Sequence, residues 1–325
     1  MTTVMAFTAP IGESTPAVTD AEIGAVVPGA EEVLRLDVRP ADPAQSLYDE
    51  VVIACEGPVR DLASRAAESG ALHVFPFAPI PALVGLGRVL GDKAACVVYD
   101  RHRHSDSWCW DDEPSSEVRW GLDASRRATK SPDVVVLLSV SGQVDQDAVD
   151  AVAPKGPRYE LFLEEPRTNV VRTREQLQQF SEKWRELVNE IARVHGGDTT
   201  VHLFPAVPLA VGVECGRRLL PKVDPKIRVY DLDNKGRFYY ALTIDHAGVC
   251  REPDAVVHGN SELLVFVALA EEFRVLRDVL GTKLTPVPDP EYGGVYYVCE
   301  LKGPRGPVRT ALKLVGEMGV SDALA

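Results

Sequence analysis

The chain has 325 residues, of which 45% are hydrophobic and 26% are charged, and its formal net charge is −13. This length allows two or three domains with separate hydrophobic cores. The negative charge argues against long nucleic acid as a partner, because such binding needs many basic side chains on phosphates, whereas helix N-termini can still bind a small phosphate ligand. No apolar segment approaches the roughly eighteen residues that cross a bilayer, so we expect no membrane partner.

The cysteines and the N-terminal residues indicate a cytoplasmic protein. Residues 1–18, MTTVMAFTAPIGESTPAV, have no basic residue before their short apolar stretch and do not form a secretory signal. The cysteines match no disulfide framework, and several lie in apolar segments, as is typical of reduced cytosolic proteins. They are Cys55, Cys96, Cys109, Cys215, Cys250 and Cys299.

In the first part of the chain, the pattern predicts a strand over 31–40 (EEVLRLDVRP), a second over 50–55 (EVVIAC) and a helix over 59–70 (VRDLASRAAESG). A further strand, ALHVF (71–75), enters a turn with prolines. A helix-period segment follows, and AACVVYD (94–100) is the next strand.

The second part follows the same plan. DVVVLLSVSG (133–142) is almost wholly apolar, as is typical of a buried parallel strand, and RYELFLEEPRTN (158–169) is predicted to be another strand. The amphipathic pattern of 174–197 predicts a helix that stops at two glycines. TTVHLF (199–204) and KIRVYDLD (226–233) are the remaining strands, on either side of a helix.

One segment of about eighteen residues occurs twice in the sequence. HVFPFAPIPALVGLGRVL (73–90) and HLFPAVPLAVGVECGRRL (202–219) align without a gap, and each leads to a strand that ends in Tyr-Asp. The matched pairs are His73 with His202, Phe75-Pro76 with Phe204-Pro205, Pro79 with Pro208, and Gly87-Arg88 with Gly216-Arg217. Strand, helix and strand in this order form a βαβ crossover, so we predict an α/β fold of two tandem Rossmann-like halves with parallel sheets.

The C-terminal part is predicted to be a separate, partial α/β unit. Its expected elements are a strand and helix in 262–280, a strand in 293–301 and a strand in 308–319, and the chain ends within the unit. We expect a first half over 1–130, a second half over 131–246, a linker over 247–260 and the third unit over 261–325.

The repeat resembles the SAVED domain, a fusion of two CARF-like halves found in bacterial antiphage signalling. The similarity rests on LLSVSG (137–142), HLFPAVPLAVGVECGRRLLPK (202–222) and the VYD strands at 98–100 and 229–231. It implies a receptor that binds a cyclic di-, tri- or tetranucleotide between the halves, self-associates on the ligand and activates a fused effector. The defence system would be CBASS-like or type III CRISPR-like.

The candidate ligand-binding residues lie where ligands bind in parallel α/β sheets, beyond the carboxyl ends of the strands. Their loops suit phosphate approach and base stacking, and two arginines after strands suit phosphate contacts. They are Ser139, Ser141, Gly142, Phe204, Pro205, Ala206, Val207 and Pro208, the equivalent Phe75, Pro76, Phe77, Ala78 and Pro79, and the arginines Arg39 and Arg167.

The C-terminal part resembles the opening of the nucleoside phosphorylase and nucleosidase family, through VFVALAEEF (265–273), GGVYYVCEL (293–301) and LVGEMGVSDALA (314–325). The resemblance implies that Glu272 contacts ribose or water and that the loop 316–319 lies near ribose or phosphate. The family's later general acid is not in this sequence, so we expect no catalysis by this chain alone. An alternative is an N-glycosidase or phosphorylase whose catalytic remainder lies beyond residue 325; a weaker one is a ligand-independent oligomerisation module.

Several motifs also have purely structural interpretations. His73 and His202 are either core histidines or ligand contacts. Gly87 and Gly216 are expected to close helices. Glu271 and Glu272 also fit the acidic first turn of a helix. The cluster Cys96, His102, His104 and Cys109 fits no standard zinc spacing, so we predict no metal and no cofactor. Ser139 and Ser141 lack the pattern of a hydrolase nucleophile.

Overall fold

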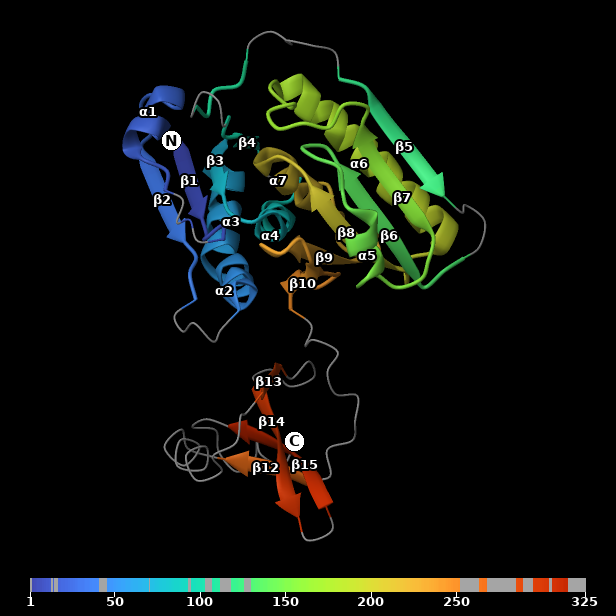
Figure 1. Cartoon of the computed structure of the whole chain (residues 1–325). Coiled ribbons are helices and arrows are strands. Elements are labelled where there is room, and N and C mark those ends of the chain that lie inside the picture. Colours follow the sequence, from blue (N-terminus) through green and yellow to red (C-terminus); the bar gives the residue numbers. More distant parts are fainter. Residues whose placement is uncertain are drawn as a thin grey trace. The chain divides into compact units, whose positions relative to one another are not determined.

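The computed structural model describes residues 2–12, 14, 17–40, 46–69, 71–92, 95–102, 107–111, 118–125, 130–251, 263–267, 285–288, 295–303 and 306–314. By their internal contacts these residues divide into two units, Met1–Arg251 and Glu252–Ala325 (Figure 1). Among the described residues, no helix combines the length and the apolar character needed to traverse a bilayer.

The first sheet of the N-terminal unit has four parallel strands in the order β2-β1-β3-β4. Their bounds are β1 Thr3–Thr8, β2 Glu32–Asp37, β3 Leu72–Phe77 and β4 Cys96–Val98. The helices of this half are α1 Asp20–Val26, α2 Leu47–Ala54, α3 Arg60–Ser69 and α4 Ile80–Leu90, and a π-helical turn, η1 Cys55–Val59, joins α2 to α3.

The second sheet has seven strands in the order β11-β10-β9-β8-β6-β7-β5. Its strands are β5 Trp120–Ser125, β6 Asp133–Ser139, β7 Arg158–Leu163, β8 Thr200–Ala206, β9 Lys226–Leu232, β10 Phe238–Ile244 and β11 Val249–Cys250. The inner four, β9-β8-β6-β7, are parallel, and antiparallel strands extend both edges. The helices of this half are α5 Gln146–Asp150, α6 Arg174–His195 and α7 Leu209–Arg217.

The two halves repeat one topology. The order β2-β1-β3-β4 corresponds strand for strand to β7-β6-β8-β9, and equivalent histidines occupy equivalent registers, with His73 opposite Val97 and His202 opposite Arg228. Each half also has its duplicated helix, α4 or α7, after the third of these strands. This arrangement confirms the predicted α/β fold of two Rossmann-like halves with parallel strands.

Two elements of the first half differ from expectation. The apolar residues TVMAFT form β1, a central strand that was not predicted from the sequence. The predicted strand over 50–55 is wrong, because these residues belong to α2 and η1. The hydroxyl of Ser46 caps α2 by accepting a hydrogen bond from the backbone N–H of Tyr48, and Asp49 and Glu50 lie in the first turn, where the helix dipole favours acidic residues.

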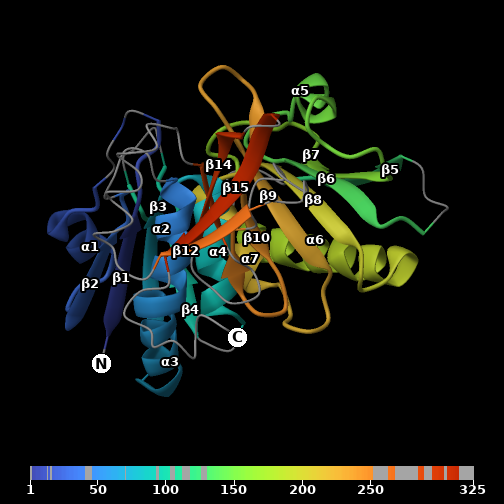
Figure 2. The ribbon, with the colours of Figure 1, turned by 90° about the horizontal axis from the view of Figure 1, so that it is seen from below.

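Helices α4 and α7 cross between the two sheets with their backbones in direct contact (Figures 1 and 2). A Cβ atom added at Gly87 would lie 1.9 Å from the carbonyl oxygen of Val213, and one added at Gly216 would lie 1.9 Å from that of Val84. Because 84 and 213 are equivalent positions of the repeat, this is one contact made twice. The expected helix-closing role is therefore corrected, since both glycines lie inside their helices and permit the close crossing.

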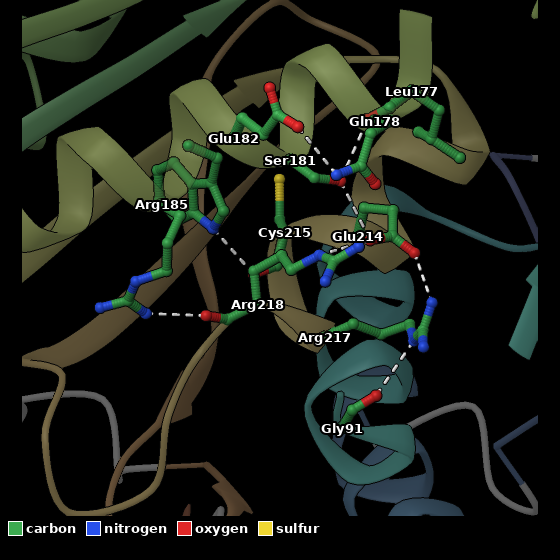
Figure 3. A network of polar contacts seen from close by, with 11 residues as sticks. Gly91, Leu177, Gln178, Ser181, Glu182, Arg185, Glu214, Cys215, Arg217 and Arg218 are labelled. Carbon is green, nitrogen blue, oxygen red and sulfur yellow. Dashed lines mark hydrogen bonds and ion pairs between the residues drawn. The ribbon is translucent and has the colours of Figure 1, made fainter. Parts of the chain in front are cut away.

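A buried polar network holds the carboxyl ends of the two helices (Figure 3). The Glu214 carboxylate on α7 is 3% exposed and accepts hydrogen bonds from Ser181 at 3.1 Å, Arg217 at 2.6 Å and Arg218 at 3.0 Å. Arg217 also donates to the carbonyl oxygen of Gly91, just after α4, at 3.0 Å. The network thus connects α6 and α7 of the second half to the first half.

The C-terminal unit contains a four-stranded sheet in the order β12-β15-β14-β13. Its strands are β12 Leu263–Val267, β13 Thr285–Pro288, β14 Val295–Gly303 and β15 Gly306–Leu314. Within the described residues the expected strands in 293–301 and 308–319 and the one opening 262–280 are confirmed, and of the described strand pairs of this sheet only β12 with β15 is parallel. The helix expected in 262–280 lies outside the described residues. Glu272 and the loop 316–319 lie outside the described residues.

The helix crossing predicts that Gly216→Ala destabilises the protein by about 3 kcal/mol, because the new methyl group meets a backbone carbonyl that cannot move alone. Urea unfolding followed by circular dichroism measures the loss. Gly24→Ala is the matched control, since Gly24 lies inside α1 and an added Cβ meets nothing within 4 Å. We expect that variant to be neutral or up to about 1 kcal/mol more stable. Equal stability of the two variants would contradict the close crossing.

Candidate ligand cleft between the two halves

A cleft of about 440 Å³ lies between the two halves of the N-terminal unit. All its lining residues follow, or end, parallel strands of one sheet or the other. They are Ile11 and Gly12 after β1, Phe77, Ala78, Pro79 and Ile80 at the end of β3, Asp100 and Arg101 after β4, Ser141 after β6, Thr168 and Asn169 after β7, Val207, Pro208 and Leu209 after β8, and Asp231 and Leu232 at the end of β9.

The topology explains the position of the cleft. In the first sheet the chain moves outward from β1 to β2 and then returns to β3 on the other side, so the loops after β1 and β3 diverge. The second sheet repeats this reversal at β6 and β8. Such switch points leave a crevice at the carboxyl ends of the strands. Here two crevices face each other and form one cleft.

Helices α4 and α7 both begin at this cleft. Their N-cap residues are Pro79 and Pro208, which have no side-chain acceptor for the first-turn N–H groups. The first bonds within the helices run from the N–H of Leu83 to the oxygen of Pro79 at 3.2 Å, and from that of Gly212 to Pro208 at 3.0 Å. Ala210 donates its N–H to Asp100, and Pro81 has none. The other first-turn N–H groups and the positive ends of two helix dipoles favour an anion in the cleft.

Arg101 supplies the positive side chain of the cleft. It is the one basic residue among the described lining residues. Its guanidinium carbon lies 4.8 Å from the centre of the Phe77 ring, and a guanidinium nitrogen lies 3.5 Å from a carboxylate oxygen of Glu22. The aromatic ring and the carboxylate thus hold the guanidinium at the cleft wall, where it can contact a phosphate.

The two aspartates of the duplicated Tyr-Asp pair have different partners. Asp100 is 4% exposed and accepts a hydrogen bond at 3.2 Å from the backbone N–H of Ala210 in the first turn of α7. Asp231 accepts hydrogen bonds on Oδ2 from the hydroxyls of Tyr48 and Tyr239, the latter at 3.0 Å. Both aspartates therefore join the two halves, because Asp100 of the first half is bound to α7 of the second, and Asp231 of the second half is bound to Tyr48 of the first.

Both tyrosines are hydrogen-bond donors over the physiological pH range. Burial, followed by the charge of Asp231, raises the pKa of Tyr239 to about 12. The same two causes raise the pKa of Tyr48 well above its ordinary value. The phenols consequently stay protonated and keep the Asp231 carboxylate in place.

Six of the residues predicted from sequence line this cleft, and the structure brings them together from both halves. They are Phe77, Ala78 and Pro79 from the first half and Ser141, Val207 and Pro208 from the second. Gly142 directly follows Ser141 but is not a lining residue. Their contact with a ligand stays a prediction.

The other predicted residues lie behind or away from the cleft wall. Phe75 and Phe204 are fully buried and stack on Tyr99 and Tyr230 with ring centres 4.6 and 4.4 Å apart. Pro76, Pro205 and Ala206 belong to β3 and β8, and buried Ser139 donates to Glu160 at 2.6 Å. The two predicted arginines are partly exposed beside nearby carboxylates, Arg39 at 2.6 Å from Asp37 and Arg167 at 3.1 Å from Glu165.

The three charged residues of the cleft, Asp100, Arg101 and Asp231, were not predicted from the sequence. Their signal was present, because both copies of the repeat end in a strand followed by Tyr-Asp. Residues directly after a parallel strand are the ones that meet ligands. Ile11 and Gly12 were not predicted either, and they reach the cleft only because β1 is a central strand.

The contacts of the duplicated histidines favour the structural interpretation. Nδ1 of His73 lies 2.8 Å from the hydroxyl of Tyr99, and Nδ1 of His202 lies 2.9 Å from that of Tyr230. His202 Nε2 also lies 3.0 Å from a carboxylate oxygen of Asp133. Burial and, secondarily, the charge of Arg174 lower the pKa of His73.

The cysteines and histidines between residues 96 and 109 lie in different surroundings. Cys96 lies in β4, His102 is buried and Cys109 is exposed. His104 lies outside the described residues. The part of the chain that is described contains no group of three or more histidine, cysteine or acidic residues arranged to hold a metal ion.

Residues 57–244 match the family model of the SAVED domain, described as the "SMODS-associated and fused to various effectors sensor domain". Among curated proteins no match is found. Similar solved structures include a Cap4 SAVED/CARF-domain containing receptor from Acinetobacter baumannii with the cyclic trinucleotide 2′3′3′-cAAA, at 14% identity and a TM-score of 0.47. The same receptor with 3′3′3′-cAAA is similar at 16% identity and a TM-score of 0.48. The Cap4 SAVED/CARF-domain containing receptor from Moraxella osloensis is similar at 15% identity and a TM-score of 0.43.

Each of these three alignments covers 65% of this chain. They cover 48% of the two Acinetobacter chains and 47% of the Moraxella chain, so this chain matches about half the length of those receptors.

The capping contact predicts that Asp100→Ala destabilises the protein by at least about 1 kcal/mol, because a buried N–H at the start of α7 loses its acceptor. Asp100→Asn keeps an oxygen at that position and should retain most of the stability. Chemical unfolding of both variants measures the difference. Equal losses from the two substitutions would show that the charge, and not the cap, is what matters.

Proposed function

Because this chain belongs to the SAVED family of sensor domains, we propose that it is a receptor for a cyclic oligonucleotide second messenger, which binds in the cleft between its two halves. The observation that carries the proposal is the geometry of α4 and α7. Two equivalent helices begin at one cleft, each after an equivalent strand. A cyclic oligonucleotide has the matching property, since it repeats a phosphate and a base around a ring.

The cleft offers a partner to each part of such a ligand. The first-turn N–H groups other than that of Ala210, the Ser141 hydroxyl and the Arg101 guanidinium suit phosphates. Apolar side chains suit the faces of bases, and two of them are unusually exposed, Ile11 at 38% and Leu232 at 51%. The volume of about 440 Å³ lies within the usual range for ligand sites.

The local arrangement also reconciles an anionic ligand with an acidic protein. A formal net charge of −13 disfavours long nucleic acid, whose affinity depends on many basic contacts. A small ligand needs only the few donors of one cleft, and these are mostly backbone groups and helix ends that carry no formal charge. We therefore propose a cyclic di-, tri- or tetranucleotide and not a nucleic-acid strand.

We further propose that binding acts on a fused effector and that the protein serves in antiphage defence. The family consists of sensor domains fused to effectors, which supports an effector role for the part of the chain that begins near residue 261. Its resemblance to nucleosidases suggests the kind of effector. Occupation of the cleft would favour one arrangement or assembly of the chain, limited by the difference in affinity between the two states.

The test is a thermal-shift screen of the whole chain against cyclic di-, tri- and tetranucleotides of adenine and guanine, with linear oligonucleotides as controls. We expect one cyclic species to raise Tm selectively, because a ligand at a hundredfold excess over its Kd stabilises the folded state by about 2.7 kcal/mol. Absence of a shift with all the cyclic species would contradict the proposal.

Arg101→Ala should then weaken binding of the selected ligand about tenfold or more, through loss of a charge-assisted contact to phosphate. Arg101→Lys keeps the charge but not the planar group over Phe77, and should lose less. The control is Arg193→Ala, which removes an arginine paired with Glu190 on the exposed face of α6. Equal affinities of Arg101→Ala and Arg193→Ala would remove Arg101 from the site.

A further inference from the structure

The two walls of the cleft have the same fold but different chemistry. In the first half, β4 is followed by Tyr99, Asp100 and Arg101, and in the second half the equivalent residues at the end of β9 are Tyr230, Asp231 and Leu232. The equivalence follows from the strand register. Val97 pairs with His73 and Arg228 pairs with His202, and these two histidines are equivalent in the repeat, so the residues that follow Val97 and Arg228 are equivalent too. The cleft therefore presents a cation on one wall and an exposed leucine at the matching position of the other.

One residue difference between the copies explains why Asp100 caps a helix and Asp231 does not. Asp100 accepts a hydrogen bond from the backbone N–H of Ala210, the second residue of α7, and so caps this helix. The second residue of α4 is Pro81, which has no N–H to donate. Asp231 therefore has no equivalent bond to make to α4. The repeat retains an aspartate at the cleft wall without its capping function.

Asp231 is nevertheless held in a fixed position. Tyr48 and Tyr239 both donate to Oδ2, and the backbone N–H of Leu232 donates to Oδ1 at 2.9 Å. A carboxylate has about four acceptor positions on its two oxygens. Among the described contacts three of these are filled, which leaves one position on Oδ1 of a residue that lines the cleft. Fixed acceptors of this kind discriminate well, because no reorganisation is needed on binding.

The chemistry of the free position restricts what it accepts. A carboxylate repels phosphate and can only accept hydrogen bonds, so its partner must be an N–H or O–H donor. Leu232, beside it, is 51% exposed and offers an apolar surface to a flat group. A nucleobase with an exocyclic amino group has both features, a planar apolar face and an N–H donor at its edge.

We propose that Asp231 is a specificity-determining residue of the cleft, whose Oδ1 accepts a hydrogen bond from the exocyclic amino group of one base of the messenger. This inference rests on the proposed function. It follows that the pseudo-symmetric cleft binds its ligand in one orientation, with a base against Asp231 and Leu232 and a phosphate against Arg101. A base without an amino group leaves the carboxylate desolvated and unpaired, and sites built to hydrogen-bond a donor reject analogues that lack it.

The experiment compares two ligands on three proteins by isothermal titration calorimetry. The ligands are the adenine-containing cyclic oligonucleotide that binds best to the unaltered chain and the same ring with purine riboside in place of adenosine, which lacks only the 6-amino groups. If the best ligand contains guanine instead, its partner is the hypoxanthine ring, which lacks the 2-amino group. The proteins are the unaltered chain, Asp231→Asn and Asp233→Asn.

We expect the unaltered chain to prefer the amino-bearing ring by about tenfold or more, which is the usual loss when a charged group that the ligand covers has no hydrogen-bond partner. Asp231→Asn should bind the two rings within about twofold of each other, because its amide can present a donor where the carboxylate accepts. The ratio of the two affinities is the readout, since removing a negative charge alone raises the affinity for both anionic rings equally.

Asp233→Asn is the matched control, because Asp233 lies two residues further on, outside the cleft lining, and accepts hydrogen bonds from Lys235 and Arg237 in a turn. It should keep the full preference. If Asp231→Asn also keeps the preference, or if the unaltered chain shows none, the role of Asp231 is refuted while the receptor proposal stands. If the unaltered chain binds no cyclic oligonucleotide of any composition, the proposed function itself fails.

Discussion

The close crossing of α4 and α7 is the constraint on which the rest of the N-terminal unit depends. Gly87 packs on the carbonyl of Val213 and Gly216 on that of Val84, so the two helix backbones touch at equivalent points. Since each helix is anchored to its own sheet, this contact fixes the position of one half against the other. It also places the amino ends of both helices at the same cleft and their carboxyl ends at the network around Glu214. A larger residue at either glycine would separate the helices and, with them, the two walls of the cleft.

The crossing explains why the chain repeats an unusual sequence. The prolines end the third strand and begin the helix without a side-chain cap, the glycines allow the two helices to meet, and the histidine, phenylalanine and tyrosine form the buried stack behind the turn. Two of the positions that differ between the copies carry the chemistry of the cleft. Pro81 in place of Ala210 releases an aspartate from capping, and Arg101 in place of Leu232 provides a cation. The duplicated residues thus build the two walls of the cleft, and the residues that differ between the copies make one wall chemically different from the other.

Much of this fold follows from sequence, because the repeat and the apolar periodicity report local structure. The strands at 133–139 and 200–206 and the helix Arg174–His195 have strong patterns and form as expected. The predictions of secondary structure fail where tertiary contacts, and not local sequence, determine the structure of a segment. The β-branched residues around 51–53 favour a strand by propensity, yet a cap at Ser46 and burial of Tyr48 and Val51 produce a helix. The short apolar stretch that forms β1 has no periodicity that separates a strand from a buried helix.

The site was harder to predict than the fold, because its main contacts join residues far apart in the chain. The bond from Ala210 to Asp100 spans 110 positions, and that from Tyr48 to Asp231 spans 183. No local pattern shows that the aspartates of two Tyr-Asp pairs face one cleft. The turns at 77–79 and 207–208 were identifiable, because a duplicated proline turn after a parallel strand marks the switch point.

We propose that the two halves build one ligand site and not two. Isothermal titration calorimetry of the whole chain with the cyclic oligonucleotide that stabilises it most tests this claim directly, through the stoichiometry of binding. We expect one messenger for each chain, because the amino ends of both helices lie at a single cleft. Two messengers for each chain, one on each half, would contradict it.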